Sequence, residues 1–288
     1  MDWQHGRELF DVHELCAAPA LSATPARPVA AIRPSAAPTA ARGPAVARVR
    51  RGPADAGKAI EITDRHAAVR PEDGKHPRQA RFVAVAGNIG AGKSTLTAFL
   101  ASRFGIQPFY EPNDANPYLS DFYADMQRYA FHSQMYFLSA KFRSHLDLAR
   151  LLDAHPHKVY VQDRTIYEDA EIFARTLHTR GTLSVRDYQT YDCMYRAIRD
   201  TLPRPDLLIY LRCSVKGLQR RIRRRGRPEE QAMDPSYLKD LQTAYEDWIG
   251  AYDLGPTLVI ETERLDYLRD IVDRVQMENA LDELLRRP

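Results

Sequence analysis

The chain has 288 residues, of which 44% are hydrophobic and 27% charged, with a formal net charge of +3. No run of 18 apolar residues occurs, so the sequence predicts no membrane-spanning segment. No basic segment is followed by an apolar one, as it is in a secretion signal, and Cys16, Cys193 and Cys213 lack metal-ligand spacing. These features predict a cytoplasmic protein.

The N-terminal part of the chain differs in composition from the rest. Between Cys16 and Ala54 no acidic residue occurs, while alanine, proline and arginine dominate. Such a segment has too little large apolar surface to offset the entropy lost on ordering. We therefore expect residues 1–78 to be a disordered extension and residues 79–288 to form one folded domain. Organelle-targeting peptides share this composition, but acidic residues within the first fourteen positions and frequent prolines argue against that interpretation.

A glycine-rich motif follows the first strongly apolar segment of the domain. Residues 81–86 predict a short buried strand, and residues 94–104 are helix-forming. The motif between them, G-x-x-x-x-G-K-[ST], consists of Gly87, Asn88, Ile89, Gly90, Ala91, Gly92, Lys93 and Ser94, followed by Thr95. In this context backbone N–H groups surround phosphate, the lysine reaches the β- and γ-phosphates, and the serine hydroxyl can bind Mg²⁺. The sequence therefore predicts a nucleoside triphosphate site rather than an ordinary glycine-rich turn.

Strands and helices alternate along the rest of the domain. The apolar periodicity predicts further strands at 106–110, 158–162, 206–211 and 257–260, and helices at 117–152, 165–178, 185–202 and from about 265. More helix is expected between the last two strands. This order predicts an α/β fold, the three-layer α/β/α architecture of P-loop NTPases with a five-stranded parallel sheet.

Two acidic residues come directly after predicted strands, Glu111 after the second and Asp163 after the third. Ligands of parallel sheets bind at the carboxyl ends of the strands, so both residues are expected beside the glycine-rich loop. Asp163 is placed to hold Mg²⁺ through water, and Arg164 can neutralise a transferring phosphate; a helix-capping aspartate is the alternative. Glu111 is a candidate base or hydrogen-bond acceptor for an attacking hydroxyl.

The densest charged segment is residues 220–227, with the sequence RRIRRRGR. A solvated helix face and a nucleic-acid patch are two interpretations. The third is a mobile lid at 220–231 whose arginines close over the phosphates. Gly226 as a hinge, with Glu229 and Glu230 directly after it, favours the lid, because a nucleic-acid surface gains little from adjacent carboxylates.

Several short motifs occur in one order along the domain: Gly87–Thr95, Tyr110-Glu111-Pro112, Asn116-Pro117-Tyr118-Leu119 with Phe122-Tyr123, Gln134, Asp163-Arg164-Thr165 with Asp169, and Arg225–Gln231. Together they resemble the deoxynucleoside kinase family, whose members phosphorylate the 5′-hydroxyl of deoxynucleosides with ATP. The resemblance covers residues 81–288.

The resemblance implies catalytic roles for five residues. Glu111 accepts a hydrogen bond from the 5′-hydroxyl, and Arg164 orients that oxygen and the carboxylate. Lys93 stabilises the transferring phosphate, while Ser94 and Asp163 lie at the Mg²⁺ ion.

The resemblance also implies how the two substrates are held. Tyr123 and Glu230 bind the 3′-hydroxyl, Gln134 contacts the base edge, and Phe173 stacks on the base. Without the resemblance, Gln134 would be interpreted as a helix-surface residue and Phe173 as simple core. The implied lid arginines over the phosphates are Arg221, Arg225 and Arg227.

Lys141 departs from the family pattern. Seven residues after the glutamine, some members carry arginine, paired with the carboxylate that corresponds to Asp169, and thymidine-preferring members carry an apolar residue. A Lys–Asp pair keeps a polar contact but lacks the planar fork of arginine. We therefore expect a purine deoxynucleoside, deoxyadenosine or deoxyguanosine, with deoxycytidine as the next candidate.

Two other functions fit parts of the sequence. A nucleoside-monophosphate kinase shares the P-loop and an arginine-rich lid, but it needs extra arginines at the acceptor phosphate, where this chain offers Tyr123, Arg128 and Gln134. A nucleic-acid-binding P-loop NTPase would use the basic N-terminal segment and residues 220–227.

The resemblance also implies a homodimer formed by helices between the second and third strands. Phe131, Tyr136 and Phe137 would suit that interface, although core packing explains them equally well. Beyond a deoxynucleoside and ATP, no nucleic-acid or membrane partner is expected.

Overall fold

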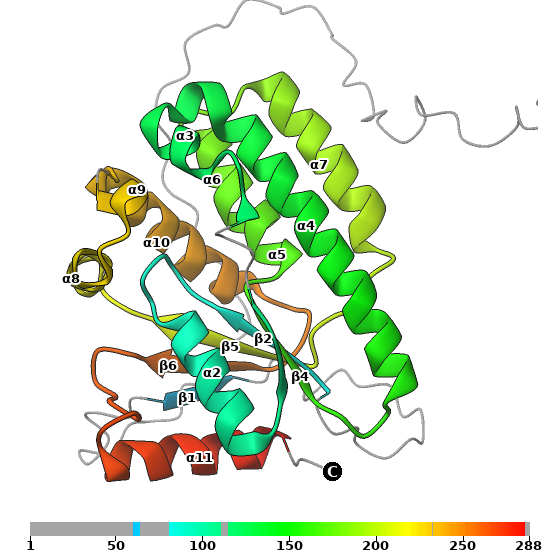
Figure 1. Cartoon of the computed structure of the whole chain (residues 1–288), viewed down its shortest axis with the longest axis vertical. Coiled ribbons are helices and arrows are strands. Elements are labelled where there is room, and N and C mark those ends of the chain that lie inside the picture. Colours follow the sequence, from blue (N-terminus) through cyan, green and yellow to red (C-terminus); the bar gives the residue numbers. More distant parts are fainter. Residues whose placement is uncertain (1–59, 64–80, 111–114, 232, 286–288) are drawn as a thin grey trace, which may run out of the picture. The chain divides into compact units, whose positions relative to one another are not determined.

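The computed structural model describes residues 60–63, 81–110, 115–231 and 233–285. Six strands of this part of the chain form one sheet in the order β1-β6-β5-β2-β4-β3 (Figure 1). The strands are β1 (Ile60–Thr63), β2 (Phe82–Ala86), β3 (Gln107–Phe109), β4 (Tyr160–Asp163), β5 (Leu207–Arg212) and β6 (Thr257–Glu261). None of the described helices is both long and apolar enough to cross a membrane.

The five predicted strands are present as β2 to β6, and each pairs in parallel with its neighbours. The sixth strand, β1, was not predicted, and it pairs antiparallel with β6, where Ile60 lies opposite Ile260. The prediction that residues 1–78 are disordered is therefore wrong for residues 60–63. The rest of that segment lies outside the described residues. The sequence Ile-Glu-Ile-Thr alternates an apolar β-branched residue with a polar one, which suits an edge strand.

Alternate residues of the strands face two separate cores. Val83 and Val85 of β2 point into a core with α2 (Lys93–Phe104) and α11 (Ile271–Leu285). Ala84 and Ala86 point into a second core, which contains α10 (Pro235–Ala251). Helices thus cover both faces of the sheet, as a mostly parallel sheet requires, and the predicted three-layer α/β/α architecture is confirmed.

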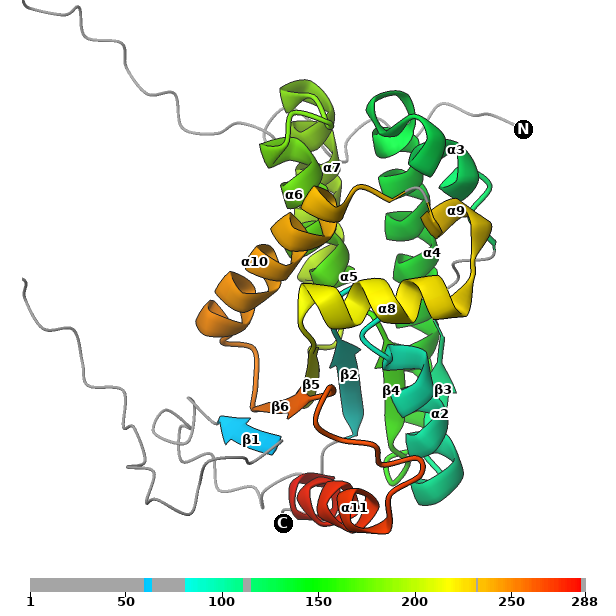
Figure 2. The ribbon, with the colours of Figure 1, turned by 90° about the vertical axis from the view of Figure 1, so that its left-hand side faces the viewer.

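The remaining helices are α3 (Leu119–Ala124), α4 (Met126–Ala154), α5 (Ile166–Glu168), α6 (Arg175–Thr179), α7 (Val185–Arg199), α8 (Val215–Arg225) and α9 (Pro228–Gln231). A π-helix, η2 (Asp169–Ala174), joins α5 to α6 without a break. Figure 2 shows α8 lying across the carboxyl end of β2, so the arginine-rich segment is part of a helix above the glycine-rich loop.

Two predicted helices differ from the structure at their ends. The helix expected over 117–152 is interrupted at Asp125, whose side chain accepts a hydrogen bond from the Arg128 N–H and so caps the start of α4. The C-terminal helix begins at Ile271 rather than near 265, because the carboxylate of Asp270 accepts from the N–H groups of Val272 and Asp273.

Candidate active site

The glycine-rich loop connects β2 to α2, and its backbone requires glycine. Gly90 and Gly92 have φ angles of 81° and 105°, a left-handed conformation that other residues rarely adopt. A Cβ atom on Gly90 would lie 3.0 Å from Cγ1 of Ile222 in α8. The glycine therefore allows both the tight turn and the close approach of α8 to the loop.

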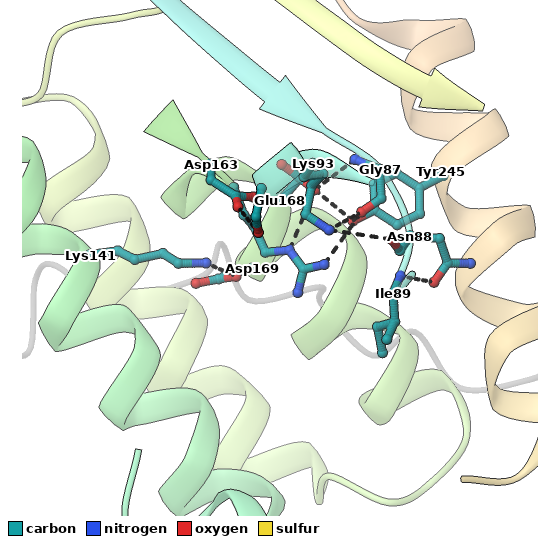
Figure 3. Close-up of polar contacts among 11 residues, drawn as sticks. Gly87, Asn88, Ile89, Lys93, Lys141, Asp163, Glu168, Asp169 and Tyr245 are labelled. Atoms are coloured by element: carbon teal, nitrogen blue, oxygen red, sulfur yellow. Dashed lines mark hydrogen bonds and ion pairs between the residues drawn. The ribbon is translucent and has the colours of Figure 1, made fainter. Parts of the chain in front are cut away.

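The polar side chains of the loop are bonded to protein groups. The Nζ atom of Lys93 donates to the carbonyl oxygens of Gly87 at 2.8 Å and Asn88 at 3.3 Å (Figure 3). The hydroxyl of Ser94 donates to Oδ2 of Asp163, the last residue of β4, at 2.6 Å. The predicted pair of Mg²⁺ ligands is thus brought together, and both are the hard oxygen donors that Mg²⁺ prefers.

A cavity of about 980 Å³ extends from the loop between the helices above the sheet. The loop lines one end with residues 89–95. Most of the residues predicted to bind the substrate also line this cavity: Tyr123, Gln134, Arg164, Asp169, Phe173, Arg221, Arg225, Arg227 and Glu230. Gly87, Asn88, Lys141 and Asp163 are not among its lining residues. Glu111, together with residues 112–114, lies outside the described residues.

The end of the cavity between α3, α4 and η2 is largely aromatic, and Asp169 and Arg164 are its charged residues. Gln134 is 4% exposed, and its Oε1 has no hydrogen-bond partner among the residues that the structure describes. Buried polar atoms are normally paired, so this oxygen points to a ligand group as its partner. Phe173 lines the same end, and the guanidinium carbon of Arg164 lies 4.3 Å from the centre of its ring.

Asp169 lines the cavity, whereas Lys141 lies behind it. The ammonium group of Lys141 is 2.6 Å from Oδ1 of Asp169, and both side chains are buried (Figure 3). The predicted Lys–Asp pair is therefore present. Its carboxylate faces the cavity, and the lysine serves as the counter-ion.

The predicted lid, residues 220–231, comprises the second half of α8, the two residues Gly226 and Arg227, and α9. Gly226 adopts a left-handed conformation with φ 72°. Arg225 forms an ion pair with Glu230, and Arg227 lies 3.8 Å from the same carboxyl group. Arg221 is tied more firmly, because it donates to the carbonyl oxygen of Ala91 in the loop at 2.8 Å.

Buried groups beneath the loop connect it to Arg164. Oε1 of Glu168 accepts from the Gly87 N–H at 3.2 Å and from the Tyr245 hydroxyl at 2.6 Å, and it lies 3.7 Å from Nε of Arg164. Arg164 itself has a φ of 59°, unusual for a residue with a side chain. Burial raises the pKa of Glu168, while Arg164 and Lys93 oppose that shift.

Several cavity residues were not predicted. The segment 262–268 lines the cavity near α8, as do Ser133, Phe137 and Tyr237. The segment follows the carboxyl end of β6, so the strand-end rule could have identified it. Phe137, suggested above for a dimer interface, is instead buried in this cavity. Glu168, which contacts Arg164, was also missed, because Arg164 lies outside α5 and no helical spacing relates the two residues.

A phosphate-binding loop on a parallel sheet, an aspartate at the neighbouring strand end and an arginine-rich helix over the loop define a P-loop phosphotransferase. Comparison with known proteins gives the family. The model of the deoxynucleoside kinase family matches residues 83–286. The chain is 38% identical over 211 residues to a deoxyadenosine/deoxycytidine kinase of Bacillus subtilis. The aligned region covers 73% of this chain and 94% of that protein.

Further relatives agree with this match. A deoxyguanosine kinase of Lactobacillus acidophilus is 36% identical over 70% of this chain and 90% of its own. The solved structure of a deoxyadenosine kinase from M. mycoides with bound dCTP has a TM-score of 0.59 and 30% identity, and covers 70% of this chain and 99% of that one. The chain therefore belongs to the deoxynucleoside kinase family and is a kinase.

Proposed function

We propose that the chain transfers the γ-phosphoryl group of ATP to the 5′-hydroxyl of a purine deoxynucleoside, with deoxycytidine as the next candidate. The observation that carries this proposal is that one cavity joins the P-loop to the buried Oε1 of Gln134, which has no hydrogen-bond partner in the described part of the chain. A phosphate donor at one end and a base at the other would leave the sugar hydroxyl between them.

At the phosphate end, the loop N–H groups and Lys93 would bind the triphosphate, and the arginines of α8 would spread the charge of the transition state. Phosphoryl transfer depends mostly on positioning and charge stabilisation, which these groups supply. Mg²⁺ would be held by Ser94 and Asp163 and would neutralise charge on the phosphates. No group of three or more acidic, histidine or cysteine residues that could hold a metal occurs among the described residues, which fits an ion bound mainly by the nucleotide.

At the acceptor end, Tyr123 and Glu230 would bind the 3′-hydroxyl, and Arg164 with Glu111 would orient the 5′-oxygen. The cavity-lining residues of α3 and α4 include no lysine or arginine. A neutral nucleoside suits this lining better than a nucleoside monophosphate, whose acceptor phosphate would need cationic partners.

The base preference is inferred from Asp169. Its carboxylate, paired with Lys141, would accept a hydrogen bond from an exocyclic amino group, while Gln134 binds the neighbouring edge of the base and Phe173 packs on its face. Adenine, guanine and cytosine carry an amino group, and thymine does not. Relatives named as deoxyadenosine, deoxyguanosine and deoxycytidine kinases support this preference.

The test is a panel of the four deoxynucleosides, dAMP and dTMP, assayed with ATP and Mg²⁺ and again with excess chelator. We expect the highest kcat/KM with a purine deoxynucleoside and no turnover with chelator. Thymidine as the best substrate would contradict the base preference, and a preference for dAMP or dTMP would contradict the acceptor.

The role of Glu111 is tested separately in the same assay. Glu111→Gln should retain nucleoside binding but lose roughly 10²-fold in kcat, as expected for a positioned base. Near-wild-type turnover would remove this carboxylate from the mechanism.

A cytoplasmic homodimer is also part of the proposal. Helix α7 carries two exposed apolar side chains, Val185 and Met194, and packs beside α4, on which Phe131 and Tyr136 are only partly buried. Sedimentation equilibrium of the full chain would determine its oligomeric state.

A further inference from the structure

Glu168 is a fully buried carboxylate that the proposed mechanism does not use. It is the last residue of α5 and does not line the cavity, although its neighbour Asp169 does. A buried carboxylate is costly unless it is paired and hydrogen-bonded, so its partners show what it holds in place.

Three partners meet at one oxygen of Glu168. They are the N–H of Gly87, the hydroxyl of Tyr245 and, at 3.7 Å, Nε of Arg164. The partners come from the first residue of the phosphate loop, from α10 and from the residue that follows β4 (Figure 3 shows Glu168 beside Gly87 and Tyr245). One carboxylate therefore joins three separate segments.

The carbonyl oxygen of Gly87 explains why a negative charge is needed. It accepts from Lys93 at 2.8 Å, from the Tyr245 hydroxyl at 3.0 Å and from Nη2 of Arg164 at 3.4 Å. Two cations thus converge on one neutral oxygen in a buried site, where their mutual repulsion is weakly screened. Glu168, bonded to the N–H of the same residue, supplies the compensating charge.

We propose that Glu168, held by Tyr245, is a positioning residue that fixes the first peptide of the phosphate loop relative to Arg164. Since Arg164 orients the accepting oxygen and the loop binds the donor, this carboxylate sets the distance between donor and acceptor. The inference rests on the proposed function, because it assigns a consequence to the alignment of those two groups.

The loss of this alignment should reduce turnover more than binding. A displacement of about 1 Å between reacting groups can cost roughly 10²-fold in rate. Glu168→Gln keeps the size and the acceptor oxygen but removes the charge, so we expect kcat to fall roughly 10²-fold with KM for both substrates nearly unchanged. Tyr245→Phe removes only the hydroxyl, and its kcat should fall by a smaller factor.

A second readout separates positioning from packing. Burial raises the pKa of Glu168, despite the opposing effects of Arg164, Lys93, Lys141 and Tyr245, so wild-type stability should fall as pH rises above the unfolded pKa of glutamate. The glutamine side chain does not titrate in this range. The Tm of the wild type should therefore fall relative to that of Glu168→Gln as pH rises.

The experiment uses the full chain, with kcat, KM and Tm measured for wild type, Glu168→Gln and Tyr245→Phe. Two matched controls are Glu171→Gln, an exposed carboxylate of η2, and Tyr252→Phe, a buried tyrosine whose hydroxyl has no hydrogen-bond partner among the described residues. Both controls should retain wild-type kcat.

Each result bears on one proposal. If the wild-type protein has no deoxynucleoside kinase activity, the proposed function is wrong and the positioning role of Glu168 is not what failed. Active wild type together with wild-type kcat in Glu168→Gln would overturn the positioning role, as would a lower Tm with unchanged kcat, which indicates packing alone. If Glu168→Gln does not fold, Tyr245→Phe decides, and its kcat at the level of Tyr252→Phe would overturn the proposal.

Discussion

The phosphate loop and the arginine-rich lid would both bind the triphosphate, but the two regions are built differently. Lys93 is buried, and its ammonium group bonds to two loop carbonyl oxygens. In the lid, the Arg225 side chain is 39% exposed and is paired with Glu230 alone in the described contacts. One region is held by many buried contacts, whereas Arg225 and Arg227 of the other are partly exposed and share one buried carboxylate.

The difference indicates how each region contributes to the reaction. Groups fixed in advance stabilise developing charge without any cost of reorganisation. Exposed ion pairs are worth little by themselves and exchange partners easily, so the lid arginines can leave Glu230 and bind phosphate instead. We therefore expect the loop to determine kcat and the lid to influence mainly the binding of ATP.

The largest effect is expected in the loop. Lys93→Met keeps the length and the apolar part of the side chain but removes the charge, so kcat should fall about 10³-fold, near the upper end for removal of one preorganised group. Steady-state and single-turnover assays measure this loss. A loss of less than tenfold would contradict the view that the buried loop carries the catalytic charge.

A smaller effect is expected in the lid. Arg225→Gln should raise KM for ATP roughly tenfold while lowering kcat less, because exposed charges act partly through screened electrostatics and the other lid arginines remain. The KM of the variant should also depend less on salt. Arg223→Gln is the matched control, since Arg223 lies on the same helix, is exposed and does not line the cavity. Equal effects of the two substitutions would show that the lid acts only through its net charge.

The smallest catalytic effect is expected from β1, which is remote from both regions. Deletion of residues 1–79 removes this strand, while deletion of residues 1–59 retains it. The longer deletion should lower the free energy of unfolding by about 1–2 kcal/mol relative to the shorter one. The reason is that it removes four cross-strand residue pairs, each of which contributes a few tenths of a kcal/mol or more. Chemical denaturation measures the difference, and the two proteins should have equal kcat. Equal stability would show that the β1–β6 pairing contributes nothing.

The sheet and the P-loop could be predicted from the sequence because both depend on local patterns. Strands β2 and β5 are nearly continuous apolar runs, and the spacing of the glycines in the loop is specific to phosphate-binding loops. Strand β1 could not be predicted in this way. It is only four residues long, and its place at the edge depends on pairing with β6, almost 200 positions later in the chain.

The substrate site could be predicted only in part. Gln134 and Asp169 were identified through the resemblance to a family, since a lone glutamine or aspartate in a helix carries no signal of its own. The joint contact of Glu168 with Gly87 and Tyr245 depends on how three distant segments pack, which no local pattern encodes. Residues 265–268, which line the cavity ahead of α11, were predicted to be helical, because the capping role of Asp270 was not recognised.

The π-helix η2 has a consequence for how this enzyme tolerates change. A π-helical turn contains one residue more than an α-helical turn, and here the wider turn separates Glu168, which bonds to the phosphate loop, from Phe173, which lines the cavity. Deleting one residue would rotate the following segment by about 100° and turn the aromatic side chain away from the cavity. Relatives that bind other bases should therefore differ here by substitution and keep the segment length constant.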